Sequence, residues 1–293
     1  MFSGVLAGLL AGALWGLVFV SPRMVDAGYS SVDLAAGRFV SYGVVSLAVV
    51  LLTRRRLPNA SQALAAAGLS LLGFTGYYLL LVFAIRDAGT EVPSLVIGTI
   101  PIWVMLLGKP GHLRWSALLP GVVLTAAGLA LMMGAPSAGT GGPHFWRGVA
   151  LAVGSLACWT AFALLNAAWL KRNPGVDATE WANWLGLATG AGALLLWMVA
   201  GSDPTALRAQ EDGVRFAVLA IATGVGSAWL ATILWNVASR RLPASLCGQL
   251  IVSETLFALA YSFAWDGRWP TVAQGAAVVL FTLGILASIK AHR

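Results

Sequence analysis

The feature that most constrains this chain is a series of long apolar runs separated by short polar segments. Ten runs occur in the 293 residues, at approximately 3–22, 31–52, 63–86, 92–109, 115–134, 147–170, 180–201, 214–239, 243–265 and 269–289. Each is close to the roughly 20 residues that an α-helix needs to cross the hydrocarbon core of a bilayer. Only 10% of the residues are charged, whereas soluble domains are about one quarter charged. We therefore predict an all-α membrane protein with ten transmembrane helices.

The basic residues between the runs predict the orientation. If the N-terminus is cytoplasmic, eleven Lys and Arg residues fall on the cytoplasmic side and six on the outer side. The positive-inside rule then places both termini in the cytoplasm of a bacterial inner membrane protein. This distribution also accounts for the net charge of +7 without a nucleic-acid partner. The first run lacks a preceding basic segment and a cleavage site, so we expect a retained helix and not a signal peptide.

Tryptophans at the ends of several runs are expected to form an aromatic belt at the membrane surfaces. These are Trp115, Trp146, Trp181 and Trp269.

The two halves of the chain resemble each other. Three short segments recur at an offset of 154 residues: Arg114-Trp115 with Arg268-Trp269, Ala84-Ile85-Arg86 with Ala238-Ser239-Arg240, and Pro101-Ile102-Trp103 with Thr255-Leu256-Phe257. Ala13-Leu14-Trp15 similarly resembles Ala157-Cys158-Trp159. We predict one five-helix repeat over residues 1–137, a second over 144–293 and a Gly-rich linker over 138–143. An odd number of helices inverts the second repeat, an arrangement typical of secondary transporters.

Several chemistries are excluded because the residues they need are missing. The three histidines, His112, His144 and His292, all lie outside the runs, and neither an H-E-x-x-H nor a G-x-x-x-x-G-K-[ST] motif occurs. A metalloprotease and an ATP-driven pump therefore lack their motifs. We predict neither enzymatic activity nor a metal or cofactor. Cys158 and Cys247 each lie in an apolar run, which favours free thiols over a disulfide.

Motifs along the chain resemble those of the drug/metabolite transporter superfamily, specifically its EamA-type exporters. The segments are Ala13–Gly16, Ile100–Trp103, Leu242–Leu246 and Ser253–Phe257. The family pattern has Glu-Pro where this chain has Glu254-Thr255. The Trp- and Tyr-rich runs look most similar to bacterial aromatic amino-acid exporters. The resemblance implies a central path lined by the first, third, fourth, sixth, eighth and ninth helices.

Two charged residues lie well inside the runs. Arg38 is about one third of the way into the second run, and Glu254 is near the middle of the ninth. Ionisable groups at such depth usually face a cavity or a partner, so both are candidates for binding or coupling. The structural alternatives are that Arg38 extends to the outer headgroups and that Glu254 hydrogen-bonds a neighbouring broken helix.

Polar and aromatic residues on the expected path-lining helices are the candidate substrate contacts. In the fourth run, Pro101 together with small polar residues frees backbone groups, which are tolerated at depth only when buried or facing water. Gln249 and Ser253 are four residues apart and share one face of the ninth helix. Tryptophan and tyrosine side chains offer stacking surface and a polar group. The candidates are Trp15, Tyr78, Ser94, Thr99, Pro101, Trp103, Trp159, Gln249 and Ser253, and further aromatics on these helices are Tyr77, Trp229 and Trp235.

Three functions remain open from the sequence. The first is a secondary transporter that exports neutral or aromatic amino acids and similar amphipathic metabolites by alternating access. The second is a proton-coupled exporter of drugs or cations, in which Glu254 carries the proton and the cation in turn. The third is a membrane scaffold or sensor that binds a ligand without moving it. The expected partners are a small-molecule substrate and the lipid bilayer; the sequence leaves the oligomeric state open, and a monomer suffices.

Overall fold

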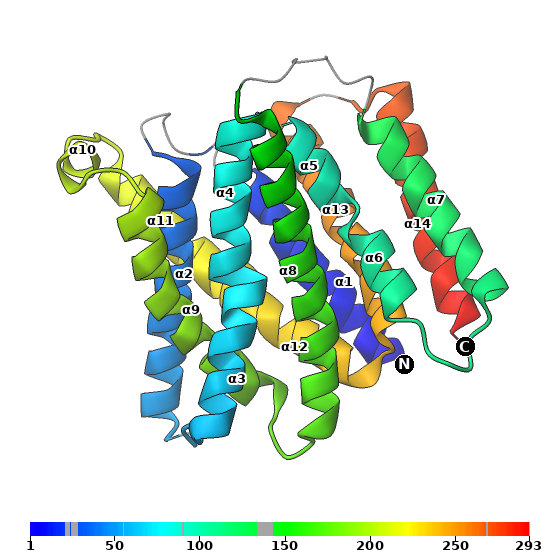
Figure 1. Cartoon of the computed structure of the whole chain (residues 1–293), viewed down its shortest axis with the longest axis horizontal. Coiled ribbons are helices and arrows are strands. Elements are labelled where there is room, and N and C mark those ends of the chain that lie inside the picture. The colour runs from blue at the N-terminus through cyan, green and yellow to red at the C-terminus, as the bar shows by residue number, and fades with distance from the viewer. Residues whose placement is uncertain are drawn as a thin grey trace.

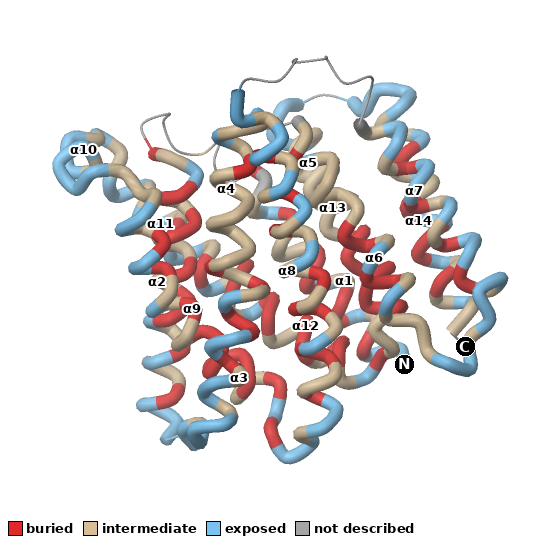
Figure 2. The backbone as a smooth tube through the Cα atoms, in the orientation of Figure 1, coloured by how far each residue is buried: buried red, intermediate tan, exposed pale blue. Residues whose placement is uncertain are grey.

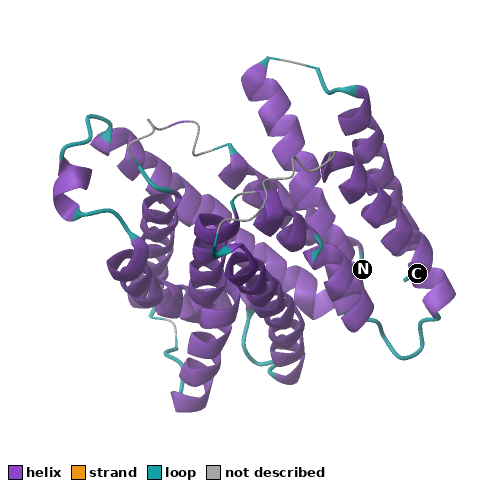
Figure 3. Cartoon of the chain, turned by 45° about the horizontal axis from the view of Figure 1, so that its top comes forward, coloured by secondary structure: helices purple, strands orange, loops and turns teal. Residues whose placement is uncertain are grey.

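The computed structural model describes residues 1–20, 24, 29–54, 56–89, 91–133, 143–267 and 269–292, and over these ranges it contains helices and no strand (Figure 3). The elements are α1 (Phe2–Gly16), η1 (Leu17–Phe19), α2 (Ser31–Leu52), α3 (Ala60–Ser70), η3 (Leu71–Thr75), α4 (Gly76–Ala88), α5 (Glu91–Gly98), α6 (Ile100–Leu107), α7 (Trp115–Met133), α8 (Phe145–Arg172), α9 (Ala178–Ala200), α10 (Pro204–Arg208), α11 (Gly213–Thr223), η4 (Gly224–Leu230), α12 (Ala231–Arg241), α13 (Ala244–Asp266) and α14 (Val272–Ala291).

The helices coincide with the predicted apolar runs. Eight helical segments of the described chain are long and apolar enough to span a membrane. Two shorter apolar helices, Phe2–Gly16 and Val92–Leu107, lie where the first and fourth crossings are predicted. The predicted all-helical fold is confirmed. Leucine, valine and methionine side chains are exposed along the outside of the bundle, which suits contact with lipid tails (Figure 2).

Side-chain caps explain where several helices begin. Ser30 and Asp33 form a reciprocal capping box at the start of α2, and Thr271 with Gln274 does the same at α14. Such boxes satisfy backbone N–H groups that the first helical turn leaves free. Asp33 also accepts hydrogen bonds from the backbone N–H and hydroxyl of Ser202, at 2.9 and 2.6 Å. The cap of α2 is therefore tied to the chain that follows α9.

A glycine ladder allows the backbone of α1 to pack closely against the backbone of α13. Gly4, Gly8, Gly12 and Gly16 recur every fourth residue, and all four are buried. An added Cβ at Gly12 would overlap the Ser253 hydroxyl and come within 3.0 Å of the Glu254 backbone N. At Gly16 it would come within 2.9 Å of the Ala258 backbone N. Small residues at this spacing allow helices to approach closely.

Corresponding segments of the two predicted repeats share features that the sequence did not predict. The third and eighth crossings each contain a π-helical segment, η3 and η4, in mid-helix. Gly4 of α1 meets Leu242 at the end of α12, and Gly148 of α8 meets Ala88 at the end of α4. Gly4 and Gly148 are 144 residues apart, as are Trp15 and Trp159, whereas Ala88 and Leu242 are 154 apart.

The bundle places both termini at one end (Figure 1). At one edge of the bundle, α7 packs on α14, and α2 packs on α9 at the opposite edge (Figure 1). The predicted linker lies outside the described residues except for Pro143. The repeat boundaries at 137 and 144 therefore stay predictions.

The predicted aromatic belt is wrong for one of its four members. Trp115, Trp146 and Trp269 are 59%, 79% and 91% exposed. Trp181 is fully buried: its ring stacks on Trp169 with 3.6 Å between centroids, and its Nε1 donates to the Asn166 side chain at 2.7 Å. A buried hydrogen-bond partner on α8 outweighs the preference of tryptophan for the membrane surface. Cys158 and Cys247 are free thiols, as predicted.

Candidate functional site

Three tryptophans from α1, α8 and α12 meet inside the bundle. The ring centroids of Trp15 and Trp159 are 6.3 Å apart, those of Trp15 and Trp235 5.3 Å, and those of Trp159 and Trp235 6.2 Å. Trp15 and Trp159 are half-buried, whereas Trp235 is 1% exposed. The Trp235 Nε1 has no hydrogen-bond partner among the described residues. This tryptophan cluster therefore joins the two repeat-related tryptophans and holds one unused donor.

A chain of ring contacts leads from the tryptophan cluster to α2. Centroid distances are 6.1 Å from Trp159 to Phe162, 5.5 Å from Phe162 to Phe74, 5.9 Å from Phe74 to Phe39 and 6.1 Å from Phe39 to Tyr78. Most of these pairs are edge-to-face, a favourable arrangement for aromatic rings. The aromatic surface is therefore continuous from α1 and α8 to the second and third crossings.

Of the two intramembrane charges, Arg38 lies at the far end of this aromatic chain, next to Phe39. Within the described chain, no ion pair within 4.0 Å joins Arg38 to Glu254.

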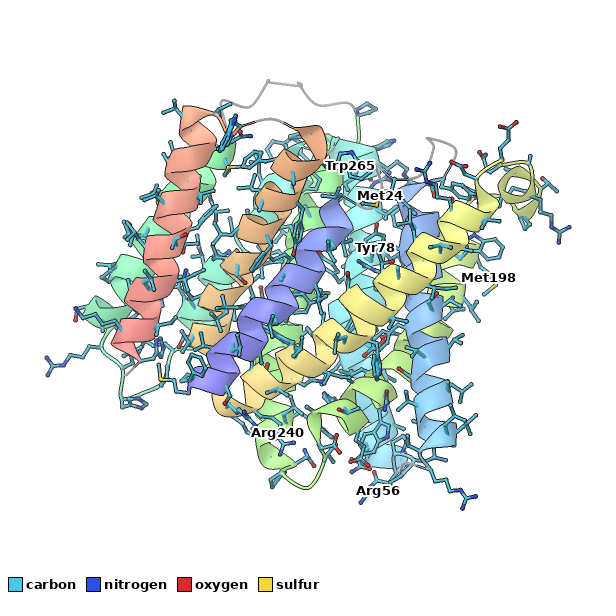
Figure 4. All side chains as sticks on the ribbon, turned by 180° about the vertical axis from the view of Figure 1, so that it is seen from behind. Met24, Arg56, Tyr78, Met198, Arg240 and Trp265 are labelled. Atoms are coloured by element: carbon cyan, nitrogen blue, oxygen red, sulfur yellow. The ribbon has the colours of Figure 1, made fainter. Side chains whose placement is uncertain are left out.

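Neither charge has a hydrogen-bond partner in the part of the chain that the structure describes. The Arg38 Nε is buried and unpaired, and the guanidinium carbon lies 4.6 Å from the Phe39 ring centroid. A pocket of about 70 Å³ adjoins Arg38 and is lined also by Ser31, Tyr78 and Thr223. The neighbouring broken helix that was the structural alternative for Glu254 supplies no hydrogen bond to it. Tyr78 is held in place because its hydroxyl donates to the Ser31 carbonyl at 2.9 Å. It lies nearer the Met24 and Trp265 end than the Arg56 and Arg240 end (Figure 4).

The predicted interruption of the fourth crossing is present, and Ile97, Ile100 and Val104 of this segment pack in the same hydrophobic core as Trp15, Trp159 and Trp235. The helix is interrupted at Thr99, and the buried Pro101 sits in the first turn of α6. The Thr99 hydroxyl donates to the Val96 carbonyl at 2.6 Å and accepts from Trp103 Nε1 at 3.2 Å. Trp103 is 45% exposed, and Ser94 is also exposed. The described ring contacts of the cluster do not include Trp103.

The predicted polar stripe on the ninth helix is buried and makes internal hydrogen bonds in this structure. Gln249 is fully buried; its Nε2 donates to Thr125 at 2.9 Å and its Oε1 accepts from Ser288 at 3.0 Å. Ser253 is 1% exposed, and its hydroxyl donates to the Leu250 carbonyl at 2.6 Å. The two residues instead join α13 to α7, α14 and α1, because neighbouring helices already occupy their face.

A second pocket, of about 480 Å³, was not predicted from the sequence. Its lining includes four basic side chains, His112, Lys171, Arg240 and Arg241, and no acidic one among the described residues. Figure 4 places Arg240 at the same end of the bundle as Arg56. Lys171 donates to the Leu242 carbonyl at 2.9 Å, and Arg240 donates to the Val176 carbonyl at 2.7 Å. The only signal in the sequence is the clustering of basic residues at the ends of two runs.

Buried amides form a further polar network that sequence reasoning missed. Asn166 donates to Asn236 at 3.0 Å, and Trp229 Nε1 donates to Asn183 at 2.8 Å. These bonds satisfy polar groups in the packing of α8, α9, η4 and α12. Trp229, a candidate path-lining aromatic, thus has an internal partner, unlike Trp235.

A bundle of apolar helices with an interior of tryptophans and unpaired charges defines a multi-pass membrane protein with a polar centre. Comparisons with known proteins identify the family to which this membrane protein belongs. The profile of the EamA-like transporter family matches residues 2–134. Inner membrane protein YtfF of Escherichia coli (strain K12) is 32% identical, over 99% of this chain and 96% of its own. The chain belongs to the EamA-like transporter family, whose members are transporters and not enzymes.

Two other similarities are consistent with this assignment. A stretch of 96 residues is 31% identical to uncharacterized transporter YdfC of Bacillus subtilis (strain 168), covering 33% of this chain and 31% of the relative. A protein of known crystal structure, 20% identical, matches 98% of both chains with a TM-score of 0.79. At that identity the likeness shows a shared fold alone.

Proposed function

We propose that this protein is a secondary transporter of the bacterial inner membrane that exports neutral and aromatic amino acids and similar amphipathic metabolites. The observation that carries the proposal is the contact between Trp15 and Trp159, whose ring centroids are 6.3 Å apart. These tryptophans occupy related places in the two halves. Their meeting in the interior provides an aromatic surface that both halves share.

Alternating access between two inverted five-helix repeats is the proposed mechanism. The paired π-helical segments, η3 and η4, and the matched contacts of Gly4 and Gly148 support a two-fold relation between the halves. In such transporters the binding site lies between the repeats, and rocking one against the other opens it to each side in turn. Both termini at one end of the bundle accord with ten crossings, and the excess of basic residues favours the cytoplasm for that end (Figure 1).

The tryptophan cluster suits an amphipathic solute. Its ring faces offer stacking surface for an apolar or aromatic group, and the unpaired Trp235 Nε1 offers one hydrogen-bond donor. Similarity to YtfF, which is an inner membrane protein by name, supports the location.

Proton-coupled export is the second candidate, and one observation favours it. The Glu254 carboxylate lies at depth without a described hydrogen-bond partner, so it is free to exchange a proton. A facilitator that moves a zwitterion down its gradient needs no such group. Glu254→Gln keeps the shape of the side chain but cannot ionise. If that variant folds and loses transport together with its dependence on an imposed pH gradient, proton antiport replaces facilitated export.

The test of the aromatic surface compares two tryptophans of the same helix. In whole-cell efflux assays with aromatic amino acids, Trp159→Ala should lower export at least tenfold at normal membrane levels, because a buried stacking surface is removed. Trp146→Ala is the matched control, since Trp146 also lies on α8 but is 79% exposed. Full activity of Trp159→Ala would show that Trp159 is a packing residue.

A further inference from the structure

The pocket of about 480 Å³, the basic pocket, gathers four basic side chains at one end of the bundle. They are His112 after α6, Lys171 at the end of α8, and Arg240 and Arg241 at the end of α12. No acidic side chain lines the pocket among the described residues, and none of the four takes part in an ion pair there. Positive charge concentrated in this way attracts an anion.

Hydrogen bonds hold three of these side chains in place. Lys171 Nζ donates to the Leu242 carbonyl at 2.9 Å, and Arg240 donates to two carbonyls of the loop before α9, at 2.7 and 3.0 Å. Arg241 donates to the Ser3 hydroxyl at 2.6 Å. An ammonium group has three N–H donors and a guanidinium five, so each side chain keeps donors for a ligand. Side chains that are ordered before binding lose little entropy when a ligand arrives.

Asp177 is the acidic residue next to this loop in the sequence, and it has another role. Its carboxylate caps α9 by accepting hydrogen bonds from the backbone N–H groups of Thr179 and Glu180, at 2.8 and 2.7 Å. Asp177 does not line the basic pocket. The charged side chains of the lining are therefore all basic in the described chain.

Most of the remaining lining is apolar and extends into the depth of the membrane. Leu164, Ala167, Ala168 and Lys171 lie on one face of α8, because they are three or four residues apart. Seven residues of an α-helix span about 10 Å. This face therefore leads from the Lys171 ammonium group towards the interior of the bundle. Leu107 at the end of α6 is 63% exposed, so the surface there also suits lipid tails.

We propose that the basic pocket binds the phosphate headgroup of an anionic phospholipid, whose acyl chains lie along the apolar face of α8. Arginine and lysine form charge-assisted hydrogen bonds with phosphate oxygens. Basic pockets between transmembrane helices on the cytoplasmic side bind such headgroups. Arg240 lies at the end of the bundle that holds both termini, and the positive-inside rule favours the cytoplasm for that end (Figure 1, Figure 4).

The size and position of the pocket agree with a lipid. Pockets of roughly 300–1,000 Å³ hold whole small molecules, and about 480 Å³ is more than a lone phosphate ion fills. The bound headgroup would join the loop after α6 to the ends of α8 and α12. Lipid binding here requires no particular transported solute.

Native mass spectrometry of the delipidated protein measures the dissociation constant of the first bound lipid. Dioleoylphosphatidylglycerol is the anionic probe, and dioleoylphosphatidylcholine has the same chains and phosphate but a cationic choline group. The wild type should bind phosphatidylglycerol about tenfold more tightly or better, because the choline group would face four basic side chains. Equal affinity for the two lipids would overturn the proposal without any variant.

Two double variants distinguish the basic pocket from the general charge of this end of the bundle. Lys171→Gln/Arg241→Gln removes two charges from the pocket and should weaken phosphatidylglycerol binding about tenfold or more. Arg114→Gln/Arg172→Gln is the matched control, since it removes the same charge from exposed residues that do not line the pocket. The control should bind like wild type, and equal losses in the two double variants would overturn the pocket as the site.

A third variant keeps the test valid if Lys171→Gln/Arg241→Gln does not fold. His112 is exposed in the loop after α6, so His112→Glu places a carboxylate in the pocket at little risk to the fold. Repulsion of the phosphate should lower the affinity for phosphatidylglycerol severalfold. Unchanged affinity in the folded His112→Glu protein would count against the proposal.

Glycerol 3-phosphate tests the apolar part of the site, because it presents a phosphate without acyl chains. In large excess it should leave phosphatidylglycerol bound. Displacement of the lipid at equal concentration would mean that the pocket binds a soluble phosphate, and the assignment to a lipid would be wrong.

Discussion

The predicted fourth and ninth crossings, α5 with α6 and α13, differ in structure. The fourth is interrupted at Thr99 between α5 and α6, whereas α13 runs unbroken from Ala244 to Asp266. Pro101 lies at the offset of 154 residues from Thr255. A proline in a helix interior removes a hydrogen bond and clashes with the preceding turn, which accounts for the break in one crossing and its absence from the other.

The neighbours of the two crossings differ as well. α13 packs on Gly8, Gly12 and Gly16 of the α1 ladder. At the offset of 144 residues, the positions of that ladder in α8 are Gly148, Ala152, Leu156 and Thr160. Larger side chains keep helices further apart. The comparison therefore distinguishes α13, which packs closely on α1, from a helix that is interrupted at Thr99.

The largest expected loss of stability comes from disrupting the close packing of α13 on α1. Gly12→Leu places a side chain where the Ser253 hydroxyl and the Glu254 backbone already lie. Overpacking of this kind should cost about 3 kcal/mol or more, since backbone cannot move aside as a flexible side chain does. Thermal unfolding in detergent measures it. Gly68→Leu is the control, because an added Cβ at Gly68 meets nothing within 4 Å. Equal stability of the two variants would contradict the close packing of α13 on the glycine ladder of α1.

A smaller loss of stability is expected when the side-chain hydrogen bonds that join α13 to α7 and α14 are removed. Gln249→Ala leaves the buried Thr125 and Ser288 hydroxyls without their amide partner. The expected loss is about 1–2 kcal/mol of unfolding free energy. Ser94→Ala serves as control, since Ser94 is exposed on α5. A variant as stable as wild type but defective in substrate binding would restore Gln249 as a ligand contact.

The smallest effect on stability, under about 1 kcal/mol, is expected for Pro101→Ala. Pro101 lies in the first turn of α6, where its missing N–H is not needed. Alanine there can close the helix across Thr99 and stiffen the fourth crossing. Export should therefore slow severalfold at normal membrane levels. Pro120→Ala, which removes an exposed proline from α7, should leave the rate unchanged. Equal rates in both variants would mean that bending at Thr99 plays no part in transport.

The sequence predicted the helices because each must satisfy its own backbone hydrogen bonds in lipid, so length and apolarity suffice to place them. It also predicted the break near Pro101. It could not predict which neighbouring helix each helix face contacts. Gln249 and Ser253 do share a face, but the periodicity of one helix does not show that α7, α14 and α1 already cover it.

The surroundings of Arg38 and Glu254 were beyond sequence reasoning for the same reason. The residues are 216 positions apart and belong to helices whose packing depends on the glycine ladder and the capped start of α2. The meeting of Trp15 and Trp159 was closer to prediction, since their related places in the two halves were visible. The third member, Trp235, became distinct only because the structure leaves its Nε1 unpaired.

The central claim is that two halves of opposite orientation meet around the tryptophan cluster, and accessibility labelling tests it most directly. Gly111 and Trp265 are 154 residues apart, in equivalent places after the fourth crossing and at the end of the ninth. Each is changed to Cys in a protein whose Cys158 and Cys247 have been replaced. With an impermeant maleimide on intact spheroplasts, Trp265→Cys should be labelled and Gly111→Cys should react only after permeabilisation. Labelling of both positions from the same side would contradict the inverted repeat and the transport mechanism built on it.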